Sequence, residues 1–418
     1  MNLRDRSLDT LTLFFVSLSL TFGACADKPA PPAEDTPPSP SPVTFIDPPA
    51  GADALAANWR VGDGVALSWL EPHGEGHVMK VAQLAGNSWS EPETIVTDSG
   101  FFANWADLPA VAVDGSGTEY AHWLQKLGDG TYAYGAHLAT RVAGGSWTTQ
   151  GLLHEDASPS EHGFVSYVPL SGGGVRSFWL DGGKMGPGGD HGHESGGAME
   201  LRTRLLDADG RGKGAETVLD PKVCECCATD AAWTSRGPLV VFRDRSDDEI
   251  RDIYVVRQDG DGWTEPVPVF DDGWQINGCP VNGPAVAAVD DRVAVVWFTA
   301  SPEPRVQIAF SDDAGATFAA PQVVDGEWPV GRVDVAMDAS GRAVVAWMGT
   351  VEGGAEIRWR VFDPDGPQGP VGIAAPTTEK RSSGVTRMQL DGDRLLFAWI
   401  ADGETRRLRV GAVPLVSP

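Results

Sequence analysis

The sequence is poor in tyrosine, cysteine and basic residues. It has five tyrosines, five cysteines, and 32 Lys and Arg against 58 Asp and Glu, which gives a formal net charge of −26. An acidic chain of this kind is repelled by nucleic-acid phosphates and by anionic surfaces, so we expect no nucleic-acid partner. Helical periodicity is not recognisable anywhere, and after residue 24 no apolar run suggests a membrane span.

The first 25 residues have the order of an export signal. Two arginines precede a mostly apolar run over residues 11–22, and two small residues then precede Cys25. This order resembles the lipobox of bacterial lipoproteins, with Phe22 at the position that leucine usually occupies. The resemblance implies cleavage before Cys25, lipid on its thiol, and a cell-envelope protein held at the outer membrane or cell surface by that lipid alone. The alternative is ordinary secretion with Cys25 unmodified.

Residues 26–49 contain nine prolines among Ala, Ser, Asp and Glu. Such a composition cannot bury enough apolar surface to fold, and proline keeps the chain extended. We therefore expect a signal peptide over residues 1–24, a disordered tether over residues 25–42, and one folded domain, monomeric, over residues 43–418.

An internal repeat sets the expected architecture of the folded domain. An aromatic residue ends a short β-like apolar run seven times, 50 to 63 residues apart, at Trp69, Trp123, Trp179, Phe242, Trp297, Trp347 and Trp399. Further strand-like runs and Gly/Asp turns surround each of them, about four runs per period. This pattern is typical of an all-β propeller with seven four-stranded blades, six being the alternative count.

The last period has room for only three strands. A strand within residues 42–49 would supply the fourth and close the ring, which removes the open sheet edges that favour aggregation.

One turn carries a more specific signal. The segment SDDAGATF over residues 311–318 resembles the Asp box, or BNR repeat, of sialidase-like propellers. The resemblance implies a structural role on the face away from the ligand site. The residues concerned are Ser311, Asp313, Gly315, Thr317 and Phe318.

In propellers, the loops that lead from one blade to the next converge around the central pore. The least repetitive and most polar segments of this sequence fall in those loops. A tryptophan with amides, carboxylates and guanidinium groups suits a glycan or another small polar ligand. The candidate ligand-binding residues are Trp105, Asp107, Glu161, His162, Asp230, Gln275, Asn277, Asn282, Arg332 and Arg381.

Four cysteines remain when Cys25 carries lipid. Three lie before the fourth blade, at Cys224, Cys226 and Cys227, and Cys279 lies before the fifth, so neighbouring entry loops should bring them together. In an oxidising compartment we expect two disulfides, with a vicinal Cys226–Cys227 bond among the three pairings that stay open. The alternatives are redox-active thiols and a thiolate metal site, with copper(I) ahead of zinc.

The loop over residues 181–200 contains His191 and His193, which are weak candidates for metal ligands. The competing interpretation is a glycine-rich loop with solvated histidines. No other cofactor is expected.

The sialidase catalytic set does not transfer to this sequence. That family needs three arginines around a carboxylate, a Tyr–Glu nucleophile pair and an acid/base Asp, whereas only Arg332 and Arg381 are candidate clamps here and no catalytic residue can be named. Fold alone does not establish function. The first hypothesis is therefore an envelope lipoprotein that binds a glycan or small polar ligand, followed by an exo-acting glycoside hydrolase and then by a copper-binding or redox protein.

Overall fold

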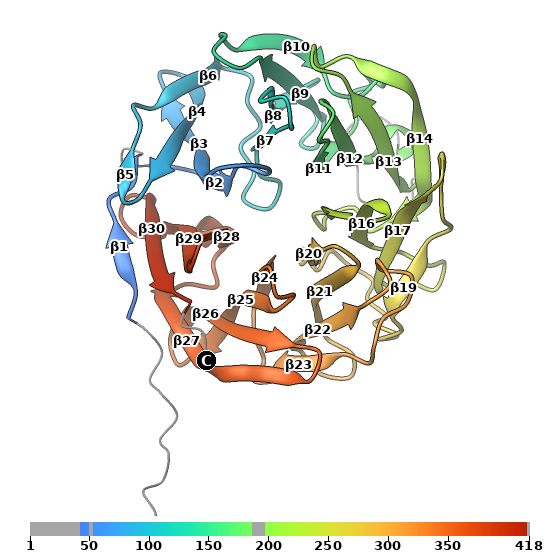
Figure 1. Cartoon of the computed structure of the whole chain (residues 1–418). Helices are drawn as coiled ribbons and strands as arrows, with labels where there is room; N and C mark the ends of the chain where they lie inside the picture. Colours follow the sequence, from blue (N-terminus) through green and yellow to red (C-terminus); the bar gives the residue numbers. More distant parts are fainter. Residues whose placement is uncertain (1–41, 50–52, 186–196, 416–418) are drawn as a thin grey trace, which may run out of the picture. The chain divides into compact units, whose positions relative to one another are not determined.

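The computed structural model describes residues 42–49, 53–185 and 197–415. The chain divides into the units Met1–Pro37 and Pro38–Pro418, and all described residues belong to the second. These residues form seven antiparallel sheets arranged as the blades of a β-propeller, as the repeat predicts (Figure 1). Among the described residues there is no helix whose length and hydrophobicity would let it cross a membrane.

Each blade runs from an inner strand at the centre of the ring to outer strands at its rim. The strands of blades 1 to 3 are β2 (Ala56–Trp59), β3 (Ala66–His73), β4 (Gly76–Ala85), β5 (Ser88–Trp89), β6 (Glu93–Asp98); β7 (Ala110–Val113), β8 (Glu119–Lys126), β9 (Tyr134–Arg141), β10 (Thr148–Leu152); and β11 (His162–Pro169), β12 (Val175–Asp181), β13 (Met199–Leu206), β14 (Gly212–Val223). Those of blades 4 to 6 are β15 (Asp230–Thr234), β16 (Gly237–Arg243), β17 (Ile253–Asp259), β18 (Gly262–Trp263), β19 (Val267–Phe270); β20 (Ala285–Val289), β21 (Arg292–Thr299), β22 (Arg305–Ser311), β23 (Gln322–Asp325); and β24 (Gly331–Met337), β25 (Ala343–Val351), β26 (Gly354–Asp363), β27 (Gly366–Thr377).

Blade 7 joins the two ends of the domain. It contains β28 (Arg387–Asp391), β29 (Arg394–Ala401), β30 (Arg407–Pro414) and, on its outer edge, β1 (Thr44–Ile46). The pairing of β1 with β30 is antiparallel and aligns Phe45 with Gly411. The prediction that an N-terminal strand closes the ring is therefore confirmed (Figure 1).

The repeated aromatic residues explain why the blades pack together. Seven apolar clusters lie between successive blades in the described residues, and each contains one of the seven repeat aromatics. Each of these side chains is at most 3% exposed. Two of the buried indoles show how such polar groups find partners: Trp347 Nε1 donates to an Asp325 carboxylate oxygen at 2.6 Å, and Trp297 Nε1 to Asp272 at 2.7 Å.

The inner strands form a closed ring, because β2, β7, β11, β15, β20, β24 and β28 each contact the inner strands of both neighbouring blades. Carboxylates tie some of these strands together. Asp230 of β15 accepts the backbone N–H of Val286 in β20 at 2.8 Å, and Asp334 of β24 accepts that of Met388 in β28 at 2.7 Å.

Candidate functional site

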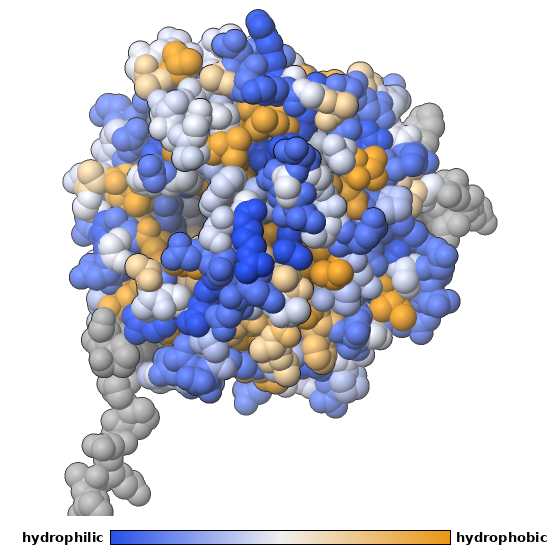
Figure 2. Space-filling view, turned by 45° about the vertical axis from the view of Figure 1, so that its right-hand side comes forward, coloured by the Kyte–Doolittle hydropathy of each residue, from blue (hydrophilic) through white to orange (hydrophobic). Residues whose placement is uncertain are grey.

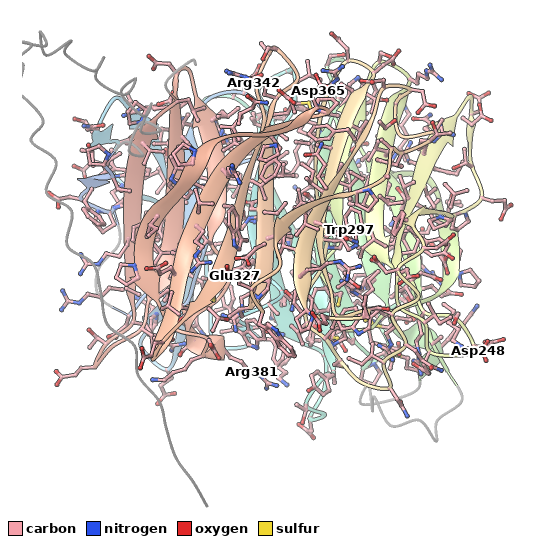
Figure 3. All side chains as sticks on the ribbon, turned by 90° about the horizontal axis from the view of Figure 1, so that it is seen from below. Asp248, Trp297, Glu327, Arg342, Asp365 and Arg381 are labelled. Atoms are coloured by element: carbon pink, nitrogen blue, oxygen red, sulfur yellow. The ribbon has the colours of Figure 1, made fainter. Side chains whose placement is uncertain are left out.

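A cavity of about 410 Å³ is lined by the inner strands of all seven blades and by the loops that enter them. In Figure 3, Asp248, Glu327 and Arg381 lie on the side of the blade-entry loops, whereas Arg342 and Asp365 lie on the opposite side. The visible face in Figure 2 is mainly hydrophilic, with apolar residues in separate patches.

Two inner strands are distorted where they line this cavity. β11 has a bulge between Gly163 and Ser166, and β24 has one between Gly331 and Asp334. Within these bulges Phe164 has a φ of 55° and Arg332 a φ of 49°, in the left-handed region that non-glycine residues seldom adopt. Bulges and strained residues concentrate at binding sites, where they redirect side chains. The part of the cavity beside the bulges of β11 and β24 is therefore the candidate site.

Four of the predicted ligand-binding residues line the cavity, namely Asp107, Asp230, Asn282 and Arg332. Trp105 lies beside them, with the Arg332 guanidinium 4.7 Å from the centre of its ring. The entry loops therefore bring half of the predicted set together.

Three residues that were not predicted also line the cavity, namely Asn58, Asp334 and Arg387. Arg387 Nε donates to Asn58 Oδ1 at 3.1 Å, and its guanidinium lies 3.5 Å from an Asp334 carboxylate oxygen. These three residues belong to inner strands rather than entry loops. Aligning the inner strands of the seven repeats would have identified them as pore-facing positions.

The carboxylates of the cavity have elevated pKa values. Burial raises the pKa of Asp230 to about 6, and the nearby Asp334 charge adds to this rise, whereas Arg387 and the Val286 N–H oppose it. Burial likewise raises the pKa of Asp334. With a pKa of about 6, Asp230 can change protonation near neutral pH, which a general acid or base requires.

Arg332 is held by the backbone rather than directed at a ligand. Its guanidinium donates to the carbonyl oxygens of Lys380 at 3.0 Å, Gly384 at 2.9 Å and Glu379 at 2.8 Å. These bonds fix the loop between β27 and β28, which contains the short 3₁₀ helix η2 (Arg381–Ser383). Most of the donors that would clamp a carboxylate are thus already used.

At the cavity wall, Asp107 contacts a buried tyrosine that also contacts Glu161. Tyr134 Oη lies 2.5 Å from Glu161 Oε1 and 3.3 Å from an Asp107 carboxylate oxygen. All three side chains are at most 2% exposed. Burial, with the Glu161 charge, raises the pKa of Asp107 to about 7, against the opposing hydrogen bonds from the Phe164 N–H and Tyr134.

His162 lies within blade 3 rather than in the cavity wall. Its Nδ1 lies 3.2 Å from an Asp181 carboxylate oxygen, and its ring stacks on His154 at 4.3 Å. Asp156, His162 and Asp181 each place one potential ligand atom within 4.8 Å of the others. Burial alone would raise the pKa of Asp181, but the hydrogen bond with His162 and nearby charges bring it below its usual range.

The remaining predicted residues, Gln275, Asn277 and Arg381, are exposed and do not line the cavity. Gln275 donates instead to the Asp248 carbonyl oxygen at 2.8 Å.

The cysteines gather at the entry to blade 4. Cys224 Sγ is 3.5 Å from Cys227 Sγ and 3.9 Å from Cys226 Sγ, and the three sulfurs all lie within 4.8 Å of one another. Cys279, from the entry to blade 5, hydrogen-bonds with Cys226. The structure contains no disulfide among these four residues, unlike the predicted pairing. Cys224 Sγ lies farther from the sulfurs of Cys226 and Cys227 than the about 2.05 Å of a covalent S–S bond.

Buried charged residues surround the sulfur cluster. Arg251 Nη1 donates to Cys224 Sγ at 3.2 Å and to Glu225 at 3.1 Å, and Arg251 Nη2 donates to Glu249 at 2.8 Å. Arg243 and Arg251 are each 1% exposed. Burial alone would raise the pKa of the Cys224 thiol, but hydrogen bonds from Cys226 and Cys227 and these arginines hold it well below its usual range.

Two predicted elements lie outside the described residues: Cys25 with the tether, and the loop containing His191 and His193.

The Asp-box turn follows β22 on the face opposite the entry loops. Ser311 Oγ donates to Asp313 at 2.7 Å and accepts the Gly315 N–H at 2.9 Å, and Thr317 Oγ1 donates to Asp313 at 2.7 Å. Gly315 has a φ of 78°, which favours glycine, and Phe318 packs against the core between blades 4 and 5. These bonds stay within the turn.

No family model matches the chain, and neither does any of the curated proteins. Similar solved structures include polysaccharide lyase Uly1, at 9% identity and a TM-score of 0.52, over 86% of this chain and 90% of that one. A puromycin hydrolase mutant matches at 14% identity and a TM-score of 0.51, over 88% of this chain and 54% of its own.

A leech intramolecular trans-sialidase matches at 11% identity and a TM-score of 0.46, over 90% of this chain and 70% of that one. The strand topology shows a seven-bladed propeller, and the identities to these solved structures leave the activity of the chain open.

Proposed function

We propose that this protein is a lipid-anchored envelope protein whose propeller binds a glycan or another small polar ligand in the central cavity. The observation that carries the proposal is the cavity of about 410 Å³, into which inner strands of separate blades direct amide, carboxylate and guanidinium groups. Preformed pockets of this size with a few converging polar groups are typical small-molecule sites.

The donors and acceptors suit a ligand with several hydroxyl groups. Arg387 and Asn58 supply N–H donors from blades 7 and 1, and Asp230 and Asn282 supply acceptors from blades 4 and 5. The Arg387 side chain remains 27% exposed, so it can reach a ligand while it contacts Asp334. Because neighbouring groups come from different blades, they can contact several hydroxyls of one sugar at once.

Two observations support binding without sialidase catalysis. The Arg332 guanidinium is occupied by three carbonyl oxygens, and the buried Tyr134 is 0% exposed, so its contact with Glu161 cannot present a nucleophile to the cavity.

Glycoside hydrolysis is the second candidate. The observation in its favour is the pKa of about 6 at Asp230, raised mainly by burial, which suits an acid catalyst near neutral pH.

The binding proposal is tested with the full-length chain, extracted in detergent, on an array of immobilised oligosaccharides. We expect Arg387→Met to weaken retention of the bound glycan at least tenfold, because the guanidinium is lost from the cavity wall. Arg381→Met is the matched control, since Arg381 is exposed and outside the lining, and it should bind like wild type. Equal binding by both variants, or loss in both, would contradict the site.

Catalysis is tested separately with a fluorogenic sialoside and a fluorogenic arabinofuranoside. We expect no turnover. Release of fluorophore that Asp230→Asn abolishes, while glycan retention persists, would replace the binding proposal with the hydrolase.

The anchor is tested by labelling cells with a radioactive fatty acid. We expect label in the wild-type chain and none in Cys25→Ser, which should also no longer be retained with the membrane fraction. Label in the variant would exclude Cys25 as the site of lipidation.

A further inference from the structure

We propose that Cys224, Cys226 and Cys227 form a three-sulfur site for one copper(I) ion. This proposal does not rest on the glycan proposal: Cys226 also lines the central cavity, but the metal ligands are sulfurs and neither site requires the other. It lies at the entry to blade 4, between the end of β14 and the start of β15.

The sulfur separations match those of thiolates around a shared ion. Metal–sulfur bonds of about 2.3 Å place sulfurs about 3.8 Å apart around a tetrahedral centre and about 4 Å apart around a trigonal one. The observed distances from Cys224 Sγ are 3.5 Å to Cys227 and 3.9 Å to Cys226. Three cysteines within four positions thus converge on one point without a change of backbone.

The donor set selects a soft cation. The group whose ligand atoms all lie within 4.8 Å of one another consists of three sulfurs, with no imidazole or carboxylate. Glu225, the only carboxylate inside the motif, bonds with Arg245 and Arg251 instead. Thiolate ligands favour copper(I) and zinc, and structural zinc is almost always four-coordinate, so three sulfurs favour copper(I).

The surroundings are built to hold these sulfurs in place. Arg251 Nη1 donates to Cys224 Sγ at 3.2 Å, while the same guanidinium is fixed by Glu225 and Glu249. Three thiolates and one copper(I) carry two negative charges, and a buried guanidinium beside them offsets part of this charge. Outer hydrogen bonds of this kind orient metal ligands and are part of a metal site.

The cysteines also form a path from solvent to the site. Cys279 is exposed, Cys226 is half-buried and lines the central cavity, and Cys224 and Cys227 are buried. Because Cys279 contacts Cys226, an ion that enters from solvent can pass from the exposed sulfur to the half-buried one and then to the two buried ones. We therefore assign Cys279 to metal entry and the other three cysteines to retention.

The experiment uses the full-length chain, reduced and kept anaerobic, which is titrated with copper(I) acetonitrile against a coloured copper(I) chelator. We expect one tightly held copper per wild-type chain, and at least a hundredfold weaker retention in Cys224→Ser, Cys226→Ser and Cys227→Ser. Cys279→Ser is the matched control: it should keep the stoichiometry of one and load more slowly.

X-ray absorption spectroscopy of the copper-loaded wild type needs no variant, so its result does not depend on whether any mutant folds. We expect a first shell of three sulfurs and no nitrogen or oxygen. Several results would overturn the proposal: copper retained by Cys224→Ser, a shell of nitrogen or oxygen, zinc bound in preference to copper, or native disulfides that re-form and abolish uptake. Glycan retention measured on the same preparations distinguishes this failure from failure of the ligand-binding proposal.

Discussion

Replacing Asp107 by asparagine should make the stability of the propeller less dependent on pH. Burial raises the pKa of this carboxyl from 3.8 to about 7, and the side chain is 1% exposed. A rise of about 3 units corresponds to about 4 kcal/mol, because one unit is worth about 1.4 kcal/mol. Because Asp107 is coupled to the neighbouring Glu161 charge, we expect about 2–4 kcal/mol.

The direction of the pH dependence follows from which state, folded or unfolded, binds the Asp107 proton more tightly. Since the folded pKa lies above the unfolded one, the stability linked to Asp107 is fully present below about pH 4 and is lost as pH rises through about 7. Asparagine resembles the protonated acid and can still accept the Tyr134 hydroxyl. We therefore expect Asp107→Asn to gain about 2–4 kcal/mol over wild type between pH 4.5 and pH 8.

Urea unfolding followed by tryptophan fluorescence at several pH values measures this gain. Asp313→Asn is the control of opposite sign. The Asp313 pKa is lowered to about 2, because the hydrogen bonds from Thr317 and Ser311 outweigh the effect of burial. The stability that Asp313 contributes is lost only as pH falls from about 4 through 2. The difference in unfolding free energy between Asp313→Asn and wild type should therefore stay constant from pH 4.5 to 8. The reasoning would be refuted if the free energy of unfolding changed with pH in the same way for wild type and Asp107→Asn over this range.

Three further substitutions test the packing. Gly163→Ala should destabilise the domain by about 1–3 kcal/mol in the same unfolding assay, because the new Cβ would lie 2.0 Å from an Asp107 carboxylate oxygen. Stability equal to that of wild type would show that the bulge can shift to admit the methyl group. Trp297→Phe should cost about 1–3 kcal/mol in thermal unfolding, since the Asp272 carboxylate loses a 2.7 Å hydrogen bond. Arg332→Lys should accelerate amide hydrogen exchange over residues 379–384, which its guanidinium holds through three carbonyls, and unchanged exchange there would assign the loop's order to other contacts.

The fold was predictable because its signals are local and repeated. Trp179 and Trp347 occupy equivalent places in separate blades, so the sequence shows the same strand seven times, and each copy supports the others. The ring closure was also predictable, because the last period lacked a strand and residues 42–49 offered one.

The candidate site was predictable only in part, because a loop position does not fix the direction of a side chain. Arg332 and Glu161 were expected to bind a ligand, but Arg332 donates to three backbone carbonyls at the cavity wall, and Glu161 bonds with the buried Tyr134. Arg243 and Arg251 were not predicted as site residues, yet both are buried beside the cysteines. Burial of a charge depends on partners from distant segments, and composition does not reveal those partners.

The pairing of β1 with β30 has a consequence for when the protein can fold. Ile46, among the first residues of the domain, must align with Val410, among the last. Bringing together such distant segments carries a large entropic cost and makes folding slow. During synthesis, the early blades can assemble in order, but the final sheet cannot form until the C-terminal strands have been made. A chain released too early would therefore expose an unpaired edge, which gives proteases and chaperones a way to recognise it.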